Sequence, residues 1–121
     1  MNRKQKSIFL CGGKEEIMQE KIQAIAFYYG FISQREILIE EMSELTQALQ
    51  KIKRSNTSDK LREAYDNFIE ELADVSIMIE QFKCYVNKDK LNEKIEEKLD
   101  RQIERMKQHE IDCRGKVENE D

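Results

Sequence analysis

The chain contains two short acidic segments inside otherwise apolar helical patterns, Glu40-Glu41-Met42-Ser43-Glu44 and Glu70-Glu71-Leu72-Ala73-Asp74. In each segment two carboxylates stand three residues apart: Glu41 with Glu44, and Glu71 with Asp74. Because successive residues of a helix turn by about 100°, residues at this spacing lie on the same side of the helix. The two segments therefore predict two helices that each carry a pair of carboxylates on one face.

The apolar residues around each segment indicate where these pairs point. On a helical wheel Glu41 falls inside the apolar stripe and Glu44 at its border, whereas Glu40 faces away from it. Glu71 and Asp74 take the corresponding positions in the second segment. An unpaired buried carboxylate costs several kcal/mol, so a cation, a basic side chain or a proton must neutralise the inner groups. Mg²⁺ is a suitable cation, because it prefers oxygen ligands.

The composition favours an all-α chain. It has 121 residues with no Pro, no Trp and only four Gly, and its length fits one domain. Charged residues make up 38% and hydrophobic residues 39%, as amphipathic helices with solvated outer faces require. A chain of this size has little material for a core, so we expect a homodimer or homotetramer that completes the core by oligomerisation.

Charge and cysteine content exclude other classes of protein. The formal net charge of -4 argues against binding to nucleic acid, which requires a basic face. Three distant cysteines suggest neither a disulfide framework nor a zinc site. Nothing in the sequence has the form of a signal peptide or a membrane span, so we expect a cytoplasmic protein with no membrane contact.

Taken in order, the pattern predicts four helices over residues 14–29, 33–54, 59–86 and 89–106. Gly30 would end the first helix, Ser33-x-x-Glu36 would open the second as a capping box, and Asp89 would cap the fourth. Residues 14–109 would form the domain, with a flexible arm at 1–13 and a disordered tail at 110–121. The second and third helices share one loop, so they should run antiparallel with their acidic pairs facing each other.

The two acidic segments also resemble a known signature. Glu41-x-x-Glu44, a separation of 26 residues and Glu71-x-x-Asp74 are similar to the motif of the MazG-like, all-α nucleoside triphosphate pyrophosphohydrolases. The flanking text, Ile39 to Leu45 and Ile69 to Val75, looks like the two motif helices of that family, and the resemblance covers about residues 20–106.

This resemblance implies a four-helix MazG-like bundle that hydrolyses a nucleoside triphosphate to the monophosphate and pyrophosphate, a house-cleaning activity on the nucleotide pool. It implies that Glu41, Glu44, Glu71 and Asp74 are both the catalytic residues and the ligands of Mg²⁺, for which Mn²⁺ could substitute. One of the four would orient the attacking water.

Substrate-binding residues are also expected. The predicted fourth helix carries a basic line at spacings of three to four residues, and triphosphates need such donors. Its members are Lys94, Lys98, Arg101 and Arg105, of which we expect the last three to bind substrate. They could equally pair with acids on the same helix. Gln34 is a candidate for reading the base or an ordinary exposed residue, and Lys51, Lys53 and Arg54 are further phosphate candidates.

The sequence leaves a second function class open. The four acids could belong to a non-enzymatic helical interaction module that binds a basic partner surface or a structural cation. Release of pyrophosphate from a nucleoside triphosphate in the presence of Mg²⁺ distinguishes the two hypotheses.

Overall fold

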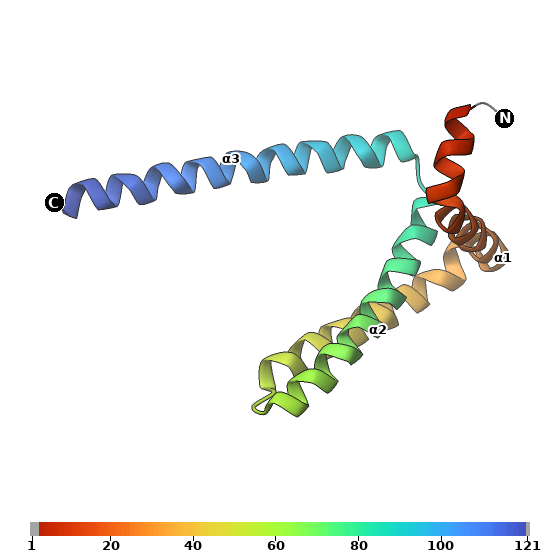
Figure 1. Cartoon of the computed structure of the whole chain (residues 1–121), viewed down its shortest axis with the longest axis horizontal. Helices are drawn as coiled ribbons and strands as arrows, with labels where there is room; N and C mark the ends of the chain where they lie inside the picture. The colour runs from red at the N-terminus through yellow and green to blue at the C-terminus, as the bar shows by residue number, and fades with distance from the viewer. Residues whose placement is uncertain (1–2, 121) are drawn as a thin grey trace. The chain divides into compact units, whose positions relative to one another are not determined.

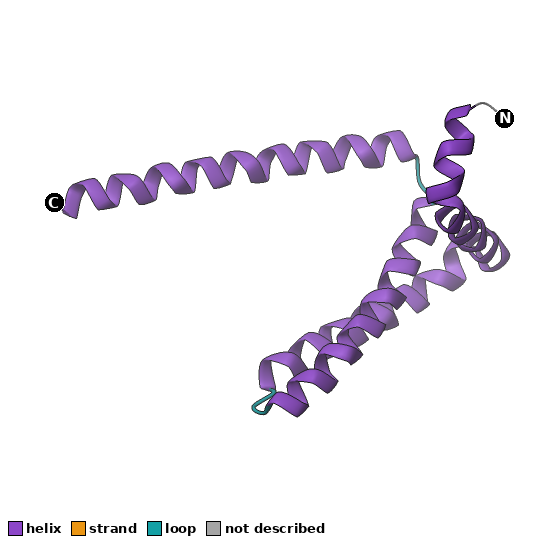
Figure 2. Ribbon diagram, viewed as in Figure 1, coloured by secondary structure: helices purple, strands orange, loops and turns teal. Residues whose placement is uncertain are grey.

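The computed structural model describes the backbone of residues 3–120 and the side chains of residues 13–117. This part of the chain contains three helices and no strand: α1 (Arg3–Arg54), α2 (Ser58–Lys83) and α3 (Lys88–Glu120) (Figures 1 and 2). It divides into two compact units, Met1–Tyr85 with α1 and α2, and Val86–Asp121 with α3. The predicted all-α class is confirmed.

The structure has three helices where the sequence predicted four, because the first two predicted helices are both part of α1, with a kink at Gly30 between them. Gly30 is the only residue inside α1 with non-helical angles, at φ 84° and ψ 167°. Glycine tolerates this positive φ because it has no Cβ. The predicted interruption at Gly30 is confirmed, but the helix resumes at once, ahead of Ser33, so the predicted capping-box start is wrong.

The other helix ends follow side-chain caps. Thr57 caps α2, and its hydroxyl accepts a bond from the amide of Lys60 at 3.2 Å. Asn87 caps α3, and its side-chain oxygen accepts from the amide of Lys90 at 3.1 Å. The predicted cap at Asp89 is therefore two residues too late. Asn and Asp side chains both accept hydrogen bonds well from the free amides of a first helical turn. The path of the backbone therefore decides which of two neighbouring residues caps the helix.

Helical backbone extends into both terminal segments of the described chain. α1 already begins at Arg3, within the segment 1–13 where we expected an arm without regular structure, and α3 continues to Glu120 through most of the expected tail, 110–121. The glycines of these segments do not stop the helices, because a helical glycine costs only about 1 kcal/mol relative to alanine. Neither segment contains a proline that would interrupt a helix. Residues 1–2 and 121 lie outside the described part.

α1 and α2 form an antiparallel hairpin joined by a short loop (Figures 1 and 2). A hydrogen bond fixes their register: the Gln34 side-chain amide donates to the Gln81 side-chain oxygen at 2.6 Å, and the two residues are only 6% and 2% exposed. Near the open end of the hairpin, the Tyr85 hydroxyl donates to the carbonyl oxygen of Ala26 at 2.5 Å. Packed aromatic rings of Phe31, Phe82 and Tyr85 lie beside this bond.

Small side chains fill the seam between the helices. The buried hydrophobic residues in the described part are Ala26, Ala48, Ala64, Val75 and Met78. Three alanines among five residues let the two helix backbones approach closely. The core of the hairpin is consequently thin.

Much apolar surface stays uncovered on this hairpin. Phe27, Tyr28 and Ile32 are 69%, 81% and 75% exposed. Large exposed apolar areas commonly mark surfaces that contact another molecule. Among the described helices, none combines the length and apolar character needed to cross a membrane.

The close seam predicts a large effect of Ala48→Leu. The extra carbons would enter a space that has no room for them, which typically costs about 1–3 kcal/mol. Urea unfolding followed by circular dichroism measures the change in the free energy of unfolding. The control is Ala73→Leu, since Ala73 is exposed on α2. Equal destabilisation by both substitutions would contradict the close packing at Ala48.

Candidate metal centre

The register of the hairpin brings the two acidic segments together. From the Gln34–Gln81 bond, seven residues forward along α1 and seven back along α2 lead to Glu41 and Asp74. Ten residues in the same directions lead to Glu44 and Glu71. The two carboxylate pairs therefore face each other across the seam, as the sequence predicted.

Three of these residues form an acidic cluster, which we define as Glu41, Glu44 and Glu71. One carboxylate oxygen from each lies within 4.8 Å of the others. Glu41 and Glu71 are half-buried, whereas Glu44 is exposed. Asp74 is exposed and lies outside this group of three, although it is close enough to act on the charges of Glu41 and Glu71.

Burial and mutual repulsion make the ionised cluster costly. Burial is the main cause that raises the pKa of Glu41, followed by the charges of Asp74, Glu44 and Glu71. Burial also leads in raising the pKa of Glu71, followed by its hydrogen bonding with Glu44 and by the neighbouring negative charges. Desolvation and like charges both disfavour the ionised form. Glu41 and Glu71 therefore hold protons more strongly than ordinary glutamates do.

Two oxygens of the cluster have no partner. Oε2 of Glu41 and Oε2 of Glu71 are buried and accept no hydrogen bond. Basic side chains do not fill this role, because the ion pairs of the described residues all lie elsewhere. Those pairs are Arg35–Glu36, Lys83–Glu80 and Lys94–Glu97. A buried acceptor without a donor is the feature that a bound cation would satisfy.

The donor set fits a hard divalent cation. All three ligand atoms are carboxylate oxygens, which suit Mg²⁺ and Mn²⁺, and the cluster contains no His or Cys. Glu41 and Glu71 would offer their covered oxygens, and the exposed Glu44 would close the group from the solvent side. Three protein ligands would leave positions for water and substrate oxygens.

The predicted substrate-binding residues are not members of the acidic cluster. Gln34 is buried in the seam and bonded to Gln81, so its side chain takes part in helix packing rather than facing solvent. Lys98, Arg101 and Arg105 are exposed residues of α3, in the second unit. The acidic cluster is built by α1 and α2 alone.

Gln81 is a structural residue that the sequence analysis missed. It buries a polar side chain and fixes the register that aligns the carboxylates. Its position in the apolar pattern of Met78 and Phe82 was a usable signal, because a polar residue inside such a stripe needs a partner on the facing helix.

Comparisons with known protein families, with curated proteins and with solved structures found no match.

The raised pKa values of Glu41 and Glu71 predict a pH effect on stability without metal. Their folded values lie above the ordinary value of 4.5, so their stabilising contribution is complete below pH 4.5 and is lost as the pH rises through the folded values. Glu41→Gln should weaken this pH dependence. The measurement is urea unfolding in EDTA over a pH series, with wild type and variant compared at each pH so that other titrations cancel.

The control for this measurement is Glu40→Gln, because Glu40 is an exposed residue on the outer face. The free energy of unfolding of the Glu40→Gln variant should depend on pH in the same way as that of the wild type. Parallel profiles for wild type and Glu41→Gln would show that the carboxyl of Glu41 titrates normally.

Proposed function

We propose that the chain is a Mg²⁺-dependent nucleoside triphosphate pyrophosphohydrolase of the MazG-like kind. The observation that carries this proposal is the convergence of Glu41, Glu44 and Glu71 within 4.8 Å, with two covered oxygens that lack a partner. The resemblance of the two acidic segments to the motif helices of that family supports the same function.

In this proposal the hairpin positions the metal-binding carboxylates before the substrate binds. Glu41 and Glu71 would hold the metal from the seam. Bound Mg²⁺ would supply an electrophile, a template for the phosphate oxygens and activation of water. The exposed Glu44 or Asp74 would orient the attacking water and accept its proton, while the water oxygen bonds to the α-phosphorus and the bond to the bridging oxygen breaks, so that pyrophosphate leaves.

Other residues have supporting roles in the proposal. Lys98, Arg101 and Arg105 offer charge-assisted donors to the phosphates, whose charge they would balance. Gln34 keeps α1 in register with α2 through its bond to Gln81, which supports a positioning role in place of base recognition.

We also propose that a second copy completes the core, as a homodimer or homotetramer. The thin seam and the exposed Phe27, Tyr28 and Ile32 support this assembly. The same exposed surface favours the second candidate function, a non-enzymatic interaction module that binds another protein. Catalysis separates the two candidates, because only the first releases pyrophosphate.

The proposed function predicts that Glu41→Gln and Glu71→Gln each lower Mg²⁺-dependent release of pyrophosphate on the order of a hundredfold or more, since even a small misplacement of a bound group can cost that much. The assay offers a panel of nucleoside triphosphates with Mg²⁺ and separates the monophosphate and pyrophosphate products. Helical circular dichroism should be retained, because each change removes a charge from a repulsive cluster.

The matched controls for activity are Glu40→Gln and Glu70→Gln, which remove the neighbouring exposed carboxylates. Both should keep near wild-type turnover. If the inner and outer substitutions had equal effects, or if no triphosphate were hydrolysed, the proposed function would be wrong.

The proposed assembly predicts a mass above that of the 14.5 kDa chain in light scattering at micromolar concentration. Ile32→Glu should shift the mass toward the monomer, because it places a charge on the exposed apolar surface. The control is Glu36→Gln, which changes a charge at another exposed position of α1. A stable, active wild-type monomer would rule out the assembly.

A further inference from the structure

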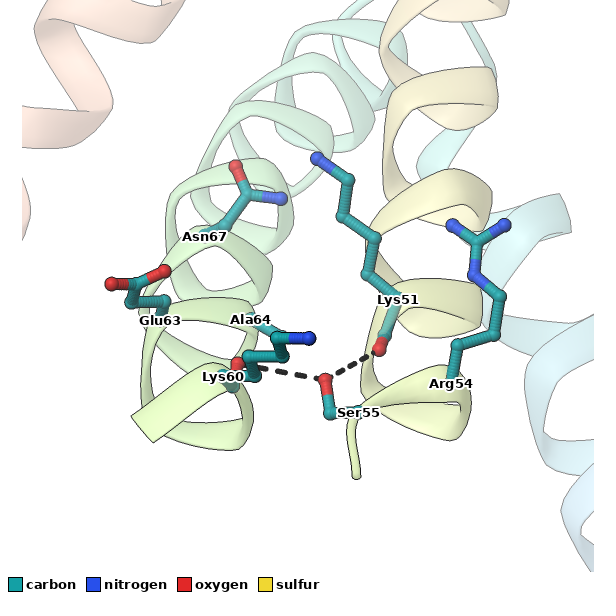
Figure 3. A pocket seen from close by; sticks show the side chains of 7 residues that line it. All are labelled: Lys51, Arg54, Ser55, Lys60, Glu63, Ala64 and Asn67. Carbon is teal, nitrogen blue, oxygen red and sulfur yellow. Dashed lines mark hydrogen bonds between the residues drawn. The ribbon is translucent and has the colours of Figure 1, made fainter. Parts of the chain in front are cut away.

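The closed end of the hairpin contains a hollow, here called the basic hollow, with a volume of about 360 Å³ (Figure 3). Its walls come from the last turn of α1, the loop and the first turns of α2. The α1 side supplies Lys51, Arg54 and Ser55, and the α2 side supplies Lys60, Glu63, Ala64 and Asn67.

The hollow follows from the register of the seam. Seventeen residues from the Gln34–Gln81 bond, Lys51 lies across from Ala64. Both residues line the hollow, Lys51 from α1 and Ala64 from α2. The Ser55 hydroxyl supports the two walls, because it donates to the carbonyl of Lys51 at 2.7 Å and reaches that of Lys60 at 3.5 Å.

The charge in the hollow is unbalanced. It contains three cations, Lys51, Arg54 and Lys60, and one carboxylate, Glu63. None of these cations takes part in an ion pair of the described residues. In Figure 3 Lys51 extends into the space between the helices on the side of Asn67, whereas the carboxylate of Glu63 points to the outer side of α2.

We propose that the basic hollow binds a phosphate-group anion of the size of pyrophosphate. Lys51 and Lys60 would approach the anion from opposite helices, Arg54 would add positive charge on the α1 side, and the Asn67 amide would add a neutral donor. Phosphate oxygens accept strong charge-assisted bonds from these groups.

This site is separate from the acidic cluster. Lys51 follows Glu44 by seven residues on the same helix, a rise of about 10 Å. Anion binding in the hollow therefore does not depend on the proposed hydrolase activity and requires no divalent cation.

Two cations of the hollow, Lys51 and Arg54, belong to the basic last turn of α1. Lysine and arginine in a last turn generally interact well with the negative end of the helix dipole. Lys53 lies in this turn of α1 as well, but it is not part of the hollow wall. Lys53 therefore provides a control that changes the net charge and the last turn without changing the hollow.

The test is calorimetric titration of the full chain with inorganic pyrophosphate in EDTA, at fixed pH and ionic strength. We expect Lys51→Gln and Lys60→Gln each to weaken binding roughly three- to tenfold, as expected for the loss of one charged donor at an open site. Lys53→Gln should keep the pyrophosphate affinity within about twofold of the wild-type value, because it removes only a charge outside the hollow that salt screens. Circular dichroism confirms that each variant is folded.

Three further variants sharpen the test. Glu63→Gln should tighten pyrophosphate binding, whereas Asp59→Asn, outside the hollow on the same helix, should change it less. Glu41→Gln should leave binding unchanged, so a failure of the hydrolase proposal and a failure of this one remain distinguishable. Absence of binding at millimolar pyrophosphate, or equal effects of Lys51→Gln and Lys53→Gln, would overturn the proposal.

Discussion

Packing α1 against α2 forces carboxylates of like charge to meet in the middle of the interface that holds the hairpin together. The Gln34–Gln81 bond and the small Ala48 and Ala64 side chains set this arrangement. A change of register by one residue would bring a helix face about 100° away into the seam. It would also leave a buried side-chain amide without a hydrogen-bond partner, which costs about 1–3 kcal/mol. The seam therefore has one favourable register, and in that register Glu41, Glu44 and Glu71 converge. Apolar packing and the buried amide pair have to offset the repulsion that this convergence creates.

The sequence predicted the inner positions of Glu41 and Glu71 because helical periodicity alone determines which face a residue occupies. Periodicity does not determine how far one helix slides along another, so the partner of each carboxylate and the burial of Gln34 required the structure. Helix ends were harder to predict for a related reason. At Gly30 a single residue takes the unusual angles while the chain continues as helix, and at α3 both Asn87 and Asp89 are chemically suitable caps. Local composition cannot choose between such near-equal alternatives.

The exposed aromatic and aliphatic residues of α1 have a physical origin in the two-helix arrangement. Each helix of a hairpin can cover only one side of its neighbour, so a helix with a broad apolar surface keeps part of that surface uncovered. Phe27, Tyr28 and Ile32 are such residues, and they lie on both sides of the bend at Gly30. The buried seam is narrow because alanines allow close approach, and close approach also limits the apolar area that the pair removes from water. Contacts with further protein surface would raise this area without altering the seam.

Charges of opposite sign are segregated along the hairpin, and this segregation has consequences for ligands. The acidic cluster lies in the middle of the seam, and the basic hollow lies about 10 Å away toward the loop, a distance close to the Debye length at physiological salt. At that separation the two groups stabilise each other only weakly, so neither neutralises the other and no ion pair joins them among the described residues. Among the described residues, the covered oxygens of Glu41 and Glu71 have no hydrogen-bond partner, and Lys51, Arg54 and Lys60 have no ion-pair partner. Because screening between the two sites grows with ionic strength, filling one should affect the other less at high salt than at low salt.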